Sequence, residues 1–161
     1  MISPLAYVNP AAKLGADVIV HPFAFIDKDV EIGDRCEIMP YASIMKGARI
    51  GSNTKIYNGA IISADPQDFR WKGDDTFCYI GDNVIIREQV IINRGIRPEG
   101  GTKVDSNCCV MAESHIGHDS HIAPYCVLGN GVKIAGDVVV EDGTIPVSYT
   151  HLRAHETVLD L

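Results

Sequence analysis

The sequence predicts an all-β fold in which short parallel strands coil into a three-sided prism of about seven turns. An aliphatic residue recurs at every sixth position, a small or β-branched residue takes the fifth place of each hexad, and Gly, Asp and Asn collect between them. An amphipathic helix repeats every 3.6 residues and a half-buried strand every two. A six-residue period fits neither, but it fits short strands that are joined by sharp corners.

The repeat runs through three blocks of the chain, residues 2–62, 80–92 and 104–140. They hold 21 hexads, and three hexads to a turn give seven turns. The aliphatic first residue of each hexad should point inward, and the small fifth residue should fill the space beside it. Parallel strands lie ~4.8 Å apart, so the prism should be ~30 Å long and be stabilised by contacts between neighbouring turns.

Two interruptions separate the blocks, and we expect both to leave the prism as external loops. The first, residues 63–79, is long and carries the only Trp of the chain, Trp71, with mixed charges around it. Loops of this length without a repeat of their own are usually functional or disordered, and we expect this one to be functional. The second, residues 95–103, is rich in Gly, and we expect it to be a plain surface loop.

Composition excludes several classes of protein. With 161 residues the chain is expected to form one domain, and its net charge of −7 argues against nucleic acid as a partner. It has neither an apolar run of about 20 residues nor the basic and apolar start of a signal peptide, so we expect a cytoplasmic protein without a membrane span. The five cysteines have no metal-type spacing, and we expect free structural thiols, with Cys108 stacked on Cys126.

Three histidines, His115, His118 and His121, lie within seven residues. Histidine is a common zinc ligand, so a metal site is one interpretation, and polar decoration of an outward surface is another. Adjacent hexads lie on different faces of the prism, and the three rings should therefore not converge within one chain. A metal site shared between subunits, as in the β-helical carbonic anhydrases, stays open.

The period also predicts which residues stack, because positions 18 apart in an unbroken block lie one above the other. Gly136 should lie one turn from His118, and Arg94 should lie one turn away on the other side. The long loop leaves from the same column at Ala64. Because Asp119 directly follows His118, and a carboxylate orients an imidazole near neutral pH, this edge suits a general base.

A set of short motifs occurs in a fixed order along the chain: Gln67-Asp68, Ile80-Gly81-Asp82, Ile86-Arg87-Glu88, Asn93-Arg94-Gly95, Thr102-Lys103-Val104 and His115-Ile116-Gly117-His118-Asp119. The repeat resembles that of the hexapeptide-repeat acyltransferases, whose fold is a left-handed parallel β-helix. The motifs resemble in particular those of the acyl carrier protein-dependent UDP-N-acetylglucosamine O-acyltransferases, which open lipid A synthesis. The resemblance runs from Ile2 to about Asp142.

The resemblance implies three catalytic residues. His118 matches the general base that takes the proton from the sugar 3-hydroxyl, and Asp119 matches the carboxylate beside it. Gly136 matches the glycine whose backbone N–H stabilises the thioester oxyanion. The chain departs from the pattern at Asn93 and Asp137, where many members of the family have His, and this puts the contributions of those two imidazoles in doubt.

The resemblance also implies the substrates. The residues that match the nucleotide-sugar site are Gln67, Asp68, Arg70 (in the neighbourhood where the family has Lys) and His115. The partners implied are an acyl carrier protein with a hydroxyacyl chain, UDP-N-acetylglucosamine and two further copies of the chain in a homotrimer. The acyl group passes directly to the sugar oxygen, with no metal, cofactor or covalent enzyme intermediate.

Two other functions fit the repeat. One is a hexapeptide-repeat acyltransferase that acts on a different nucleotide amino-sugar. The other is a non-catalytic β-helix with a structural or binding role. A catalytic protein should have His118, Gly136 and the loop with Gln67 and Asp68 around one cleft, and this geometry separates the two classes.

The repeat is expected to end near residue 146, which gives a β-helix over residues 1–146 and a tail over residues 147–161. Residues 147–157 match, without a mismatch, the translation of a transposase-type sequencing adapter, so we expect a non-native tail. Family members continue with further turns and a helical domain. We therefore expect residues 1–161 to be an N-terminal fragment with weak activity and poor solubility, because an uncapped β-helix exposes strand edges.

Overall fold

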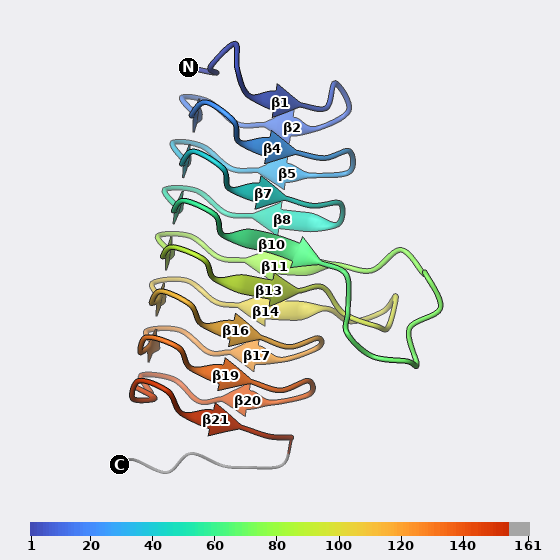
Figure 1. Ribbon diagram of the computed structural model, residues 1–161, viewed down its shortest axis with the longest axis vertical. Helices are drawn as coiled ribbons and strands as arrows, with labels where there is room; N and C mark the ends of the chain where they lie inside the picture. The colour runs from blue at the N-terminus through green and yellow to red at the C-terminus, as the bar shows by residue number, and fades with distance from the viewer. Residues whose placement is uncertain (155–161) are drawn as a thin grey trace.

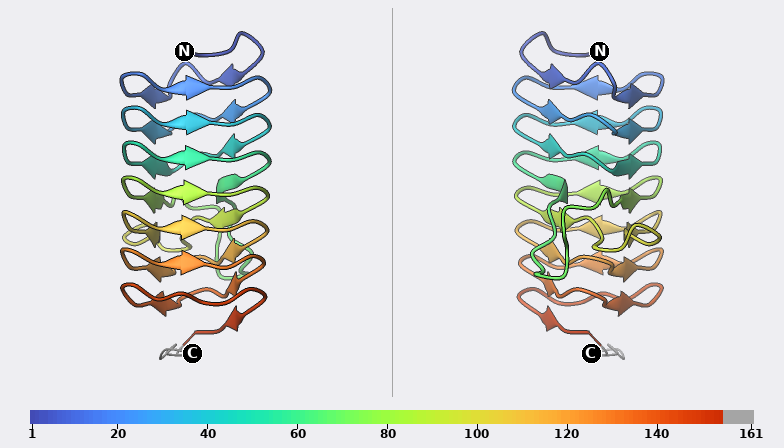
Figure 2. Two further views of the ribbon diagram at one scale, coloured as in Figure 1. Left: turned by 90° about the vertical axis from the view of Figure 1, so that its left-hand side faces the viewer. Right: turned by 90° about the vertical axis from the view of Figure 1, so that its right-hand side faces the viewer.

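The computed structural model describes residues 1–154, and they form the expected left-handed parallel β-helix. Its strands lie in three parallel sheets that make the three faces of a prism (Figures 1 and 2). From β1 to β17, each strand pairs with the strand three places later in the chain, because one turn of the coil contains one strand from each face, and β19 pairs with β21. The described residues contain no helix, and hence no helix that could cross a membrane.

The three sheets have eight, seven and six strands, which together make seven turns. The eight-stranded sheet consists of β1 (Tyr7–Val8), β4 (Phe25–Ile26), β7 (Ser43–Ile44), β10 (Ile61–Ala64), β13 (Ile91–Asn93), β16 (His115–Ile116), β19 (Lys133–Ile134) and β21 (His151–Leu152). The seven-stranded sheet consists of β2 (Lys13–Leu14), β5 (Glu31–Ile32), β8 (Ala48–Ile50), β11 (Cys78–Ile80), β14 (Thr102–Val104), β17 (His121–Ile122) and β20 (Val139–Val140). The six-stranded sheet consists of β3 (Ile19–Val20), β6 (Glu37–Ile38), β9 (Lys55–Ile56), β12 (Ile85–Ile86), β15 (Cys109–Val110) and β18 (Val127–Leu128).

The core is a set of aliphatic ladders inside the coil, as the period predicts. Ile26 pairs with Ile44, 18 residues later, and both are fully buried. The small fifth residues, such as Ala42 and Ala60, are also fully buried, because they fill the narrow space beside each corner. Cys108 and Cys126 are buried free thiols, as expected.

The corners have left-handed backbone at the fourth position of many hexads. Asp119 (φ 55°) and Asp137 (φ 59°) adopt it, as do aromatic residues such as Phe23 (φ 65°) and Tyr41 (φ 62°). Asp tolerates this conformation better than most residues, because its short polar side chain bonds locally. The third and fourth residues of a hexad therefore project outward from the edge, side by side.

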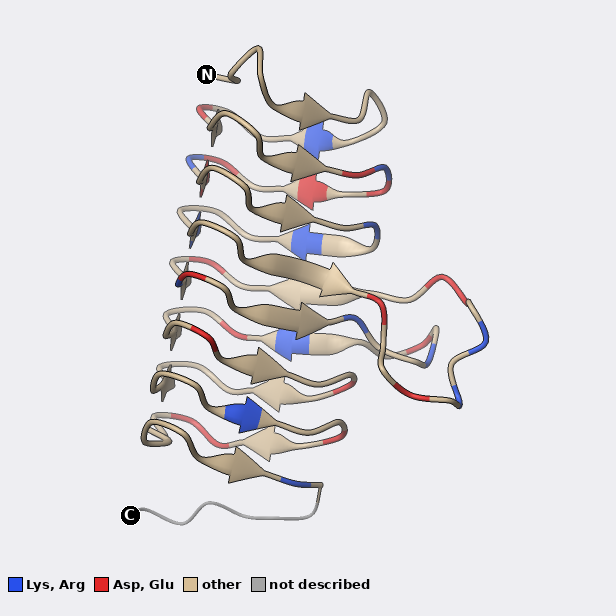
Figure 3. Cartoon of the chain, in the orientation of Figure 1, with Lys and Arg blue, Asp and Glu red and all other residues tan. Residues whose placement is uncertain are grey.

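Both interruptions leave the prism on the same side (Figures 1 and 2). The first connects β10 to β11 through residues 65–77, and the second connects β13 to β14 through residues 94–101. Figure 3 shows acidic and basic residues along the longer connection, which descends beside the later turns of the coil.

The coil continues past the boundary that we expected at residue 146. β21 pairs in parallel with β19 through His151 and Leu152, and Leu152 is buried. The six-residue step from Val140 passes through Pro146, a non-aliphatic residue, and reaches Leu152, so the hexad phase persists. The expected end of the β-helix was therefore wrong by one strand. The adapter origin of residues 147–161 stays a prediction, and residues 155–161 lie outside the described part.

Adjacent isoleucines on β12 test whether the inward ladder stabilises the coil. Ile86 is fully buried and Ile85 is 43% exposed. We expect Ile86→Ala to lower the free energy of unfolding by about 2–5 kcal/mol, because it leaves a cavity between turns. Ile85→Ala is the matched control and should cost less than about 1 kcal/mol. Urea unfolding followed by circular dichroism measures both, and equal losses would contradict the inward ladder.

Candidate active site

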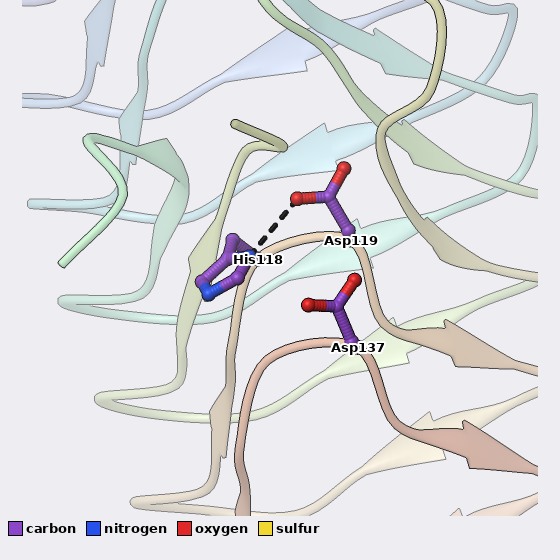
Figure 4. Close-up of side chains that lie close together, drawn as sticks. All are labelled: His118, Asp119 and Asp137. Carbon is purple, nitrogen blue, oxygen red and sulfur yellow. Dashed lines mark hydrogen bonds and ion pairs between the residues drawn. The ribbon is translucent and has the colours of Figure 1, made fainter. Parts of the chain in front are cut away.

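The candidate site lies on the edge of the prism that follows the eight-stranded sheet. His118 and Asp119 follow β16, and Gly136 and Asp137 follow β19 one turn further on. The 18-residue register therefore places Gly136 beneath His118 and Asp137 beneath Asp119. Figure 4 shows the second of these pairs, the carboxylates of Asp119 and Asp137. This confirms the predicted column.

The imidazole of His118 is buried between two carboxylates. Its Nδ1 lies 2.9 Å from Asp119 Oδ2, and its Nε2 lies 3.1 Å from Asp68 Oδ2. The ring packs on the backbone of Gly136, where an added Cβ would overlap it. A residue other than glycine at position 136 would therefore displace the imidazole.

Asp119 is fixed by the connection between β13 and β14 and by the first residue of β14. Its carboxylate accepts a hydrogen bond from the Ile96 N–H at 2.9 Å, and its own N–H donates to Thr102 Oγ1 at 2.9 Å. Its side chain is only 5% exposed. The hydrogen bonds hold Oδ2 where it can accept the Nδ1–H of His118, and Nε2 then faces Asp68.

The longer connection is anchored to the prism by Arg94, which is 1% exposed. The guanidinium contacts Asp65 at 2.7 Å, donates to the Ser63 carbonyl at 3.1 Å and lies 5.1 Å from the ring of Trp71. Asn93 donates to the Asp65 carbonyl at 2.7 Å. This root directs the following residues back over the edge that carries His118.

Two arginines favour the ionised form of Asp68 and of Asp137. Hydrogen bonds from Arg70 hold the pKa of Asp68 well below its usual range, with a smaller contribution from the charge of His118. The hydrogen bond from Arg97 likewise lowers the pKa of Asp137. Because an ionised carboxylate only accepts hydrogen bonds, both groups favour protonated or hydroxyl partners.

The structure brings together five of the seven residues that the sequence analysis proposes for the site: His118, Asp119, Gly136, Asp68 and Arg70. Gln67 is exposed on the same connection as Asp68. His115 lies on β16, outside this cluster, and burial together with the charge of Lys133 lowers its pKa. The roles of these residues stay predictions.

The three clustered histidines do not converge, as the period predicts. His115 lies on the eight-stranded sheet, whereas His121 lies on the seven-stranded sheet and pairs with Asp105 at 2.6 Å. A different group, His118, Asp119 and Asp137, offers three ligand atoms within 4.8 Å of one another. The guanidinium group of Arg97 contacts the carboxylates of Asp119 and Asp137.

Residues 95–103 contribute to the site, and the expectation of a plain surface loop was wrong. Ile96 and Arg97 from this segment both contact Asp119. No periodic signal marked them, because the segment has left the repeat. Asp137 was noted only as a departure, although it lies 18 residues after Asp119 and the column predicts their proximity.

Comparison with known proteins identifies the family. Residues 2–99 match the family model described as GMPPB C-terminal domain, which covers more than half of the chain, so the chain belongs to the family that this model defines. Residues 101–136 match the model described as bacterial transferase hexapeptide (six repeats). No curated protein sequence matches the chain.

Solved structures give a closer assignment. The UDP-N-acetylglucosamine acyltransferase of Bacteroides fragilis is 46% identical over 91% of this chain and 58% of its own, with a TM-score of 0.89. That of Francisella novicida is 40% identical over 94% of this chain and 55% of its own, with a TM-score of 0.90. The chain thus spans less than two thirds of the length of these two relatives. By its repeats and by its identity to these enzymes, the chain belongs to the hexapeptide-repeat acyltransferases, among the UDP-N-acetylglucosamine acyltransferases.

Proposed function

We propose that the protein containing this chain transfers a 3-hydroxyacyl group from the thioester of an acyl carrier protein to the 3-hydroxyl of UDP-N-acetylglucosamine. This is the first step of lipid A synthesis. The observation that carries the proposal is the His118 imidazole, held by Asp119 and packed on Gly136 at the root of the long connection. The names of the related enzymes support the acceptor.

His118 is the general base in this proposal. Asp119 accepts the Nδ1–H at 2.9 Å, so Nε2 is the nitrogen that takes the proton from the sugar hydroxyl. The ring cannot turn freely, because it packs on Gly136 and Asp119 is itself held by the Ile96 N–H. This fixed orientation supplies the proximity that a direct transfer between two bound substrates needs.

Asp68 marks where the sugar binds. Its carboxylate lies 3.1 Å from Nε2, at the position that a substrate hydroxyl must take. Asp68 is on a connection outside the coil, so it can move while His118 stays in place. On binding, the 3-hydroxyl replaces Asp68 as the partner of Nε2, and Asp68 accepts a hydrogen bond from a neighbouring hydroxyl. Gln67, Arg70 and His115 complete the nucleotide-sugar site.

Gly136 serves the oxyanion. Among the described residues, none accepts a hydrogen bond from its N–H, which leaves this donor for a ligand beside Nε2. The sugar oxygen attacks the thioester carbonyl carbon while His118 takes the proton, and the carbonyl oxygen becomes an oxyanion that the Gly136 N–H stabilises. The C–S bond then breaks, and the leaving thiolate recovers the proton from His118.

We also propose that the full-length protein is cytoplasmic and forms a homotrimer with the site between neighbouring subunits. The acyl carrier protein and the uridine diphosphate need more surface than one edge of the prism provides, and a neighbouring subunit would supply it. For residues 1–161 alone we expect weak or absent transfer. Analytical ultracentrifugation of the full-length protein should give three times the mass of one chain.

Replacing the proposed base tests the chemistry. We expect His118→Ala in the full-length protein to lower kcat by about 10²–10⁴-fold, since this is the contribution of a general base. The control is His21→Ala, which removes an imidazole that pairs with Glu37 at 2.8 Å away from the site. Transfer from acyl-carrier-protein thioester is measured with UDP-N-acetylglucosamine and with its 3-deoxy analogue. Undiminished transfer by His118→Ala, or transfer to the 3-deoxy analogue, would refute the mechanism.

Adding one methyl group at position 136 tests the packing. Gly136→Ala should lower kcat about 10²-fold, because its Cβ forces the imidazole from its place. Gly143→Ala is the control, since a Cβ there meets open space and only the left-handed backbone (φ 69°) is strained. It should cost about 1 kcal/mol of stability and leave kcat unchanged. Thermal unfolding and transfer assays together separate the two effects, and a fully active Gly136→Ala would contradict the proposed geometry.

A further inference from the structure

Six side chains at the site form a closed ring of ionic contacts. Going round it, His118 contacts Asp119 at 2.9 Å, Asp119 contacts Arg97 at 3.8 Å, and Arg97 contacts Asp137 at 2.8 Å. Asp137 contacts Arg70 at 3.7 Å, and Arg70 contacts Asp68 at 2.8 Å. Asp68 returns to His118 at 3.1 Å.

The ring joins four segments that are distant in the sequence. Asp68 and Arg70 come from the connection between β10 and β11, and Arg97 comes from the connection between β13 and β14. His118 and Asp119 follow β16, and Asp137 follows β19, as Figure 4 shows for these three side chains. Arg97 is the one member that contacts a carboxylate on each of two successive turns.

With a neutral imidazole, the ring carries one more negative charge than positive charges. Three carboxylates, those of Asp68, Asp119 and Asp137, face two guanidinium groups and the imidazole. Without Arg97, the carboxylates of Asp119 and Asp137 would face each other on adjacent turns. Arg70, between Asp137 and Asp68, would be the one arginine left in the ring. The repulsion between the two carboxylates would disturb Asp119, the residue that orients His118, and would favour a proton on the imidazole.

We propose that Arg97 and Asp137 are positioning residues for the transfer reaction: the pair holds Asp119 in register with His118 and balances the charge around the imidazole. The inference rests on the proposed function of His118 as base. Asp137 holds Arg97 over the edge by a 2.8 Å contact, and Arg97 in turn faces Asp119. Neither residue touches the reacting atoms, so both act through Asp119 and His118.

The titration of the His118 imidazole tests this role without any substrate. It is followed by NMR on the full-length protein with ¹³C-labelled histidine, and His118→Ala assigns the signal. Arg97→Met removes a positive charge and should move the midpoint up by about 0.5–1 pH unit. Asp137→Asn removes a negative charge and should move it down by about the same amount. In the double variant, the His118 midpoint should lie closer to that of the parent than in either single variant.

Two further variants separate charge from folding. Arg97→Lys keeps the charge, so the His118 midpoint in this variant should lie near that of the parent. If the role of Arg97 were purely steric, the midpoint would be displaced as in Arg97→Met. Arg87→Met is the matched control, because Arg87 pairs with Glu88 at 3.0 Å away from the ring. Its midpoint should equal that of the parent.

The pH dependence of kcat/KM in the full-length protein gives the second measurement. The midpoint pH of the acid limb of this profile should rise with Arg97→Met and fall with Asp137→Asn. In both variants kcat should fall by a larger factor than KM changes. Midpoints that equal the parent value in both single variants, or that move in the same direction, would overturn the inference. If the midpoints are displaced as expected but the parent protein transfers no acyl group, the proposed function is refuted, while the inference on the charge balance at His118 still holds.

Discussion

The 18-residue register between successive turns is the constraint on which the rest of this structure depends. Parallel pairing repeats the same backbone hydrogen bonds at every turn, so within an unbroken block each side chain lies over the one 18 places later. A slip of one residue would turn the buried aliphatic ladders outward, and their burial therefore locks the register. The same lock places Gly136 under the ring of His118 and Asp137 under Asp119. The packing of the core therefore fixes the geometry of the site.

The corner conformation explains why a His-Asp pair fits this edge. The fourth residue of the hexad adopts left-handed backbone, which Asp accepts more readily than most residues, and this turns its side chain beside that of the third residue. Asp119 can then accept the Nδ1–H of the preceding His118. A rigid coil thus orients the base with two neighbouring residues and one glycine, while the connections outside the coil supply the groups that have to move.

Asp137 shows how a departure from the family pattern becomes intelligible in three dimensions. From the sequence alone, Asp137 counts as the loss of an imidazole. In the structure its carboxylate is the partner of Arg97, which comes from the segment expected to be inert. The substitution is therefore one half of an ion pair, and its effect depends on whether position 97 carries a positive charge. The ring of six side chains makes this dependence local and electrostatic.

The sequence by itself determined the strands, the inward residues and the column of His118 and Gly136. All three follow from the six-residue period, which can be read from a continuous stretch of sequence. It misplaced the end of the coil, since Pro146 interrupts the aliphatic pattern although Leu152 keeps the phase. Only the tertiary structure decided how Asp68, Arg70 and Arg97 reach the edge. Their segments have left the repeat, so their position depends on long-range contacts, such as those of the buried Arg94 and the Ile96 N–H, which no local pattern encodes.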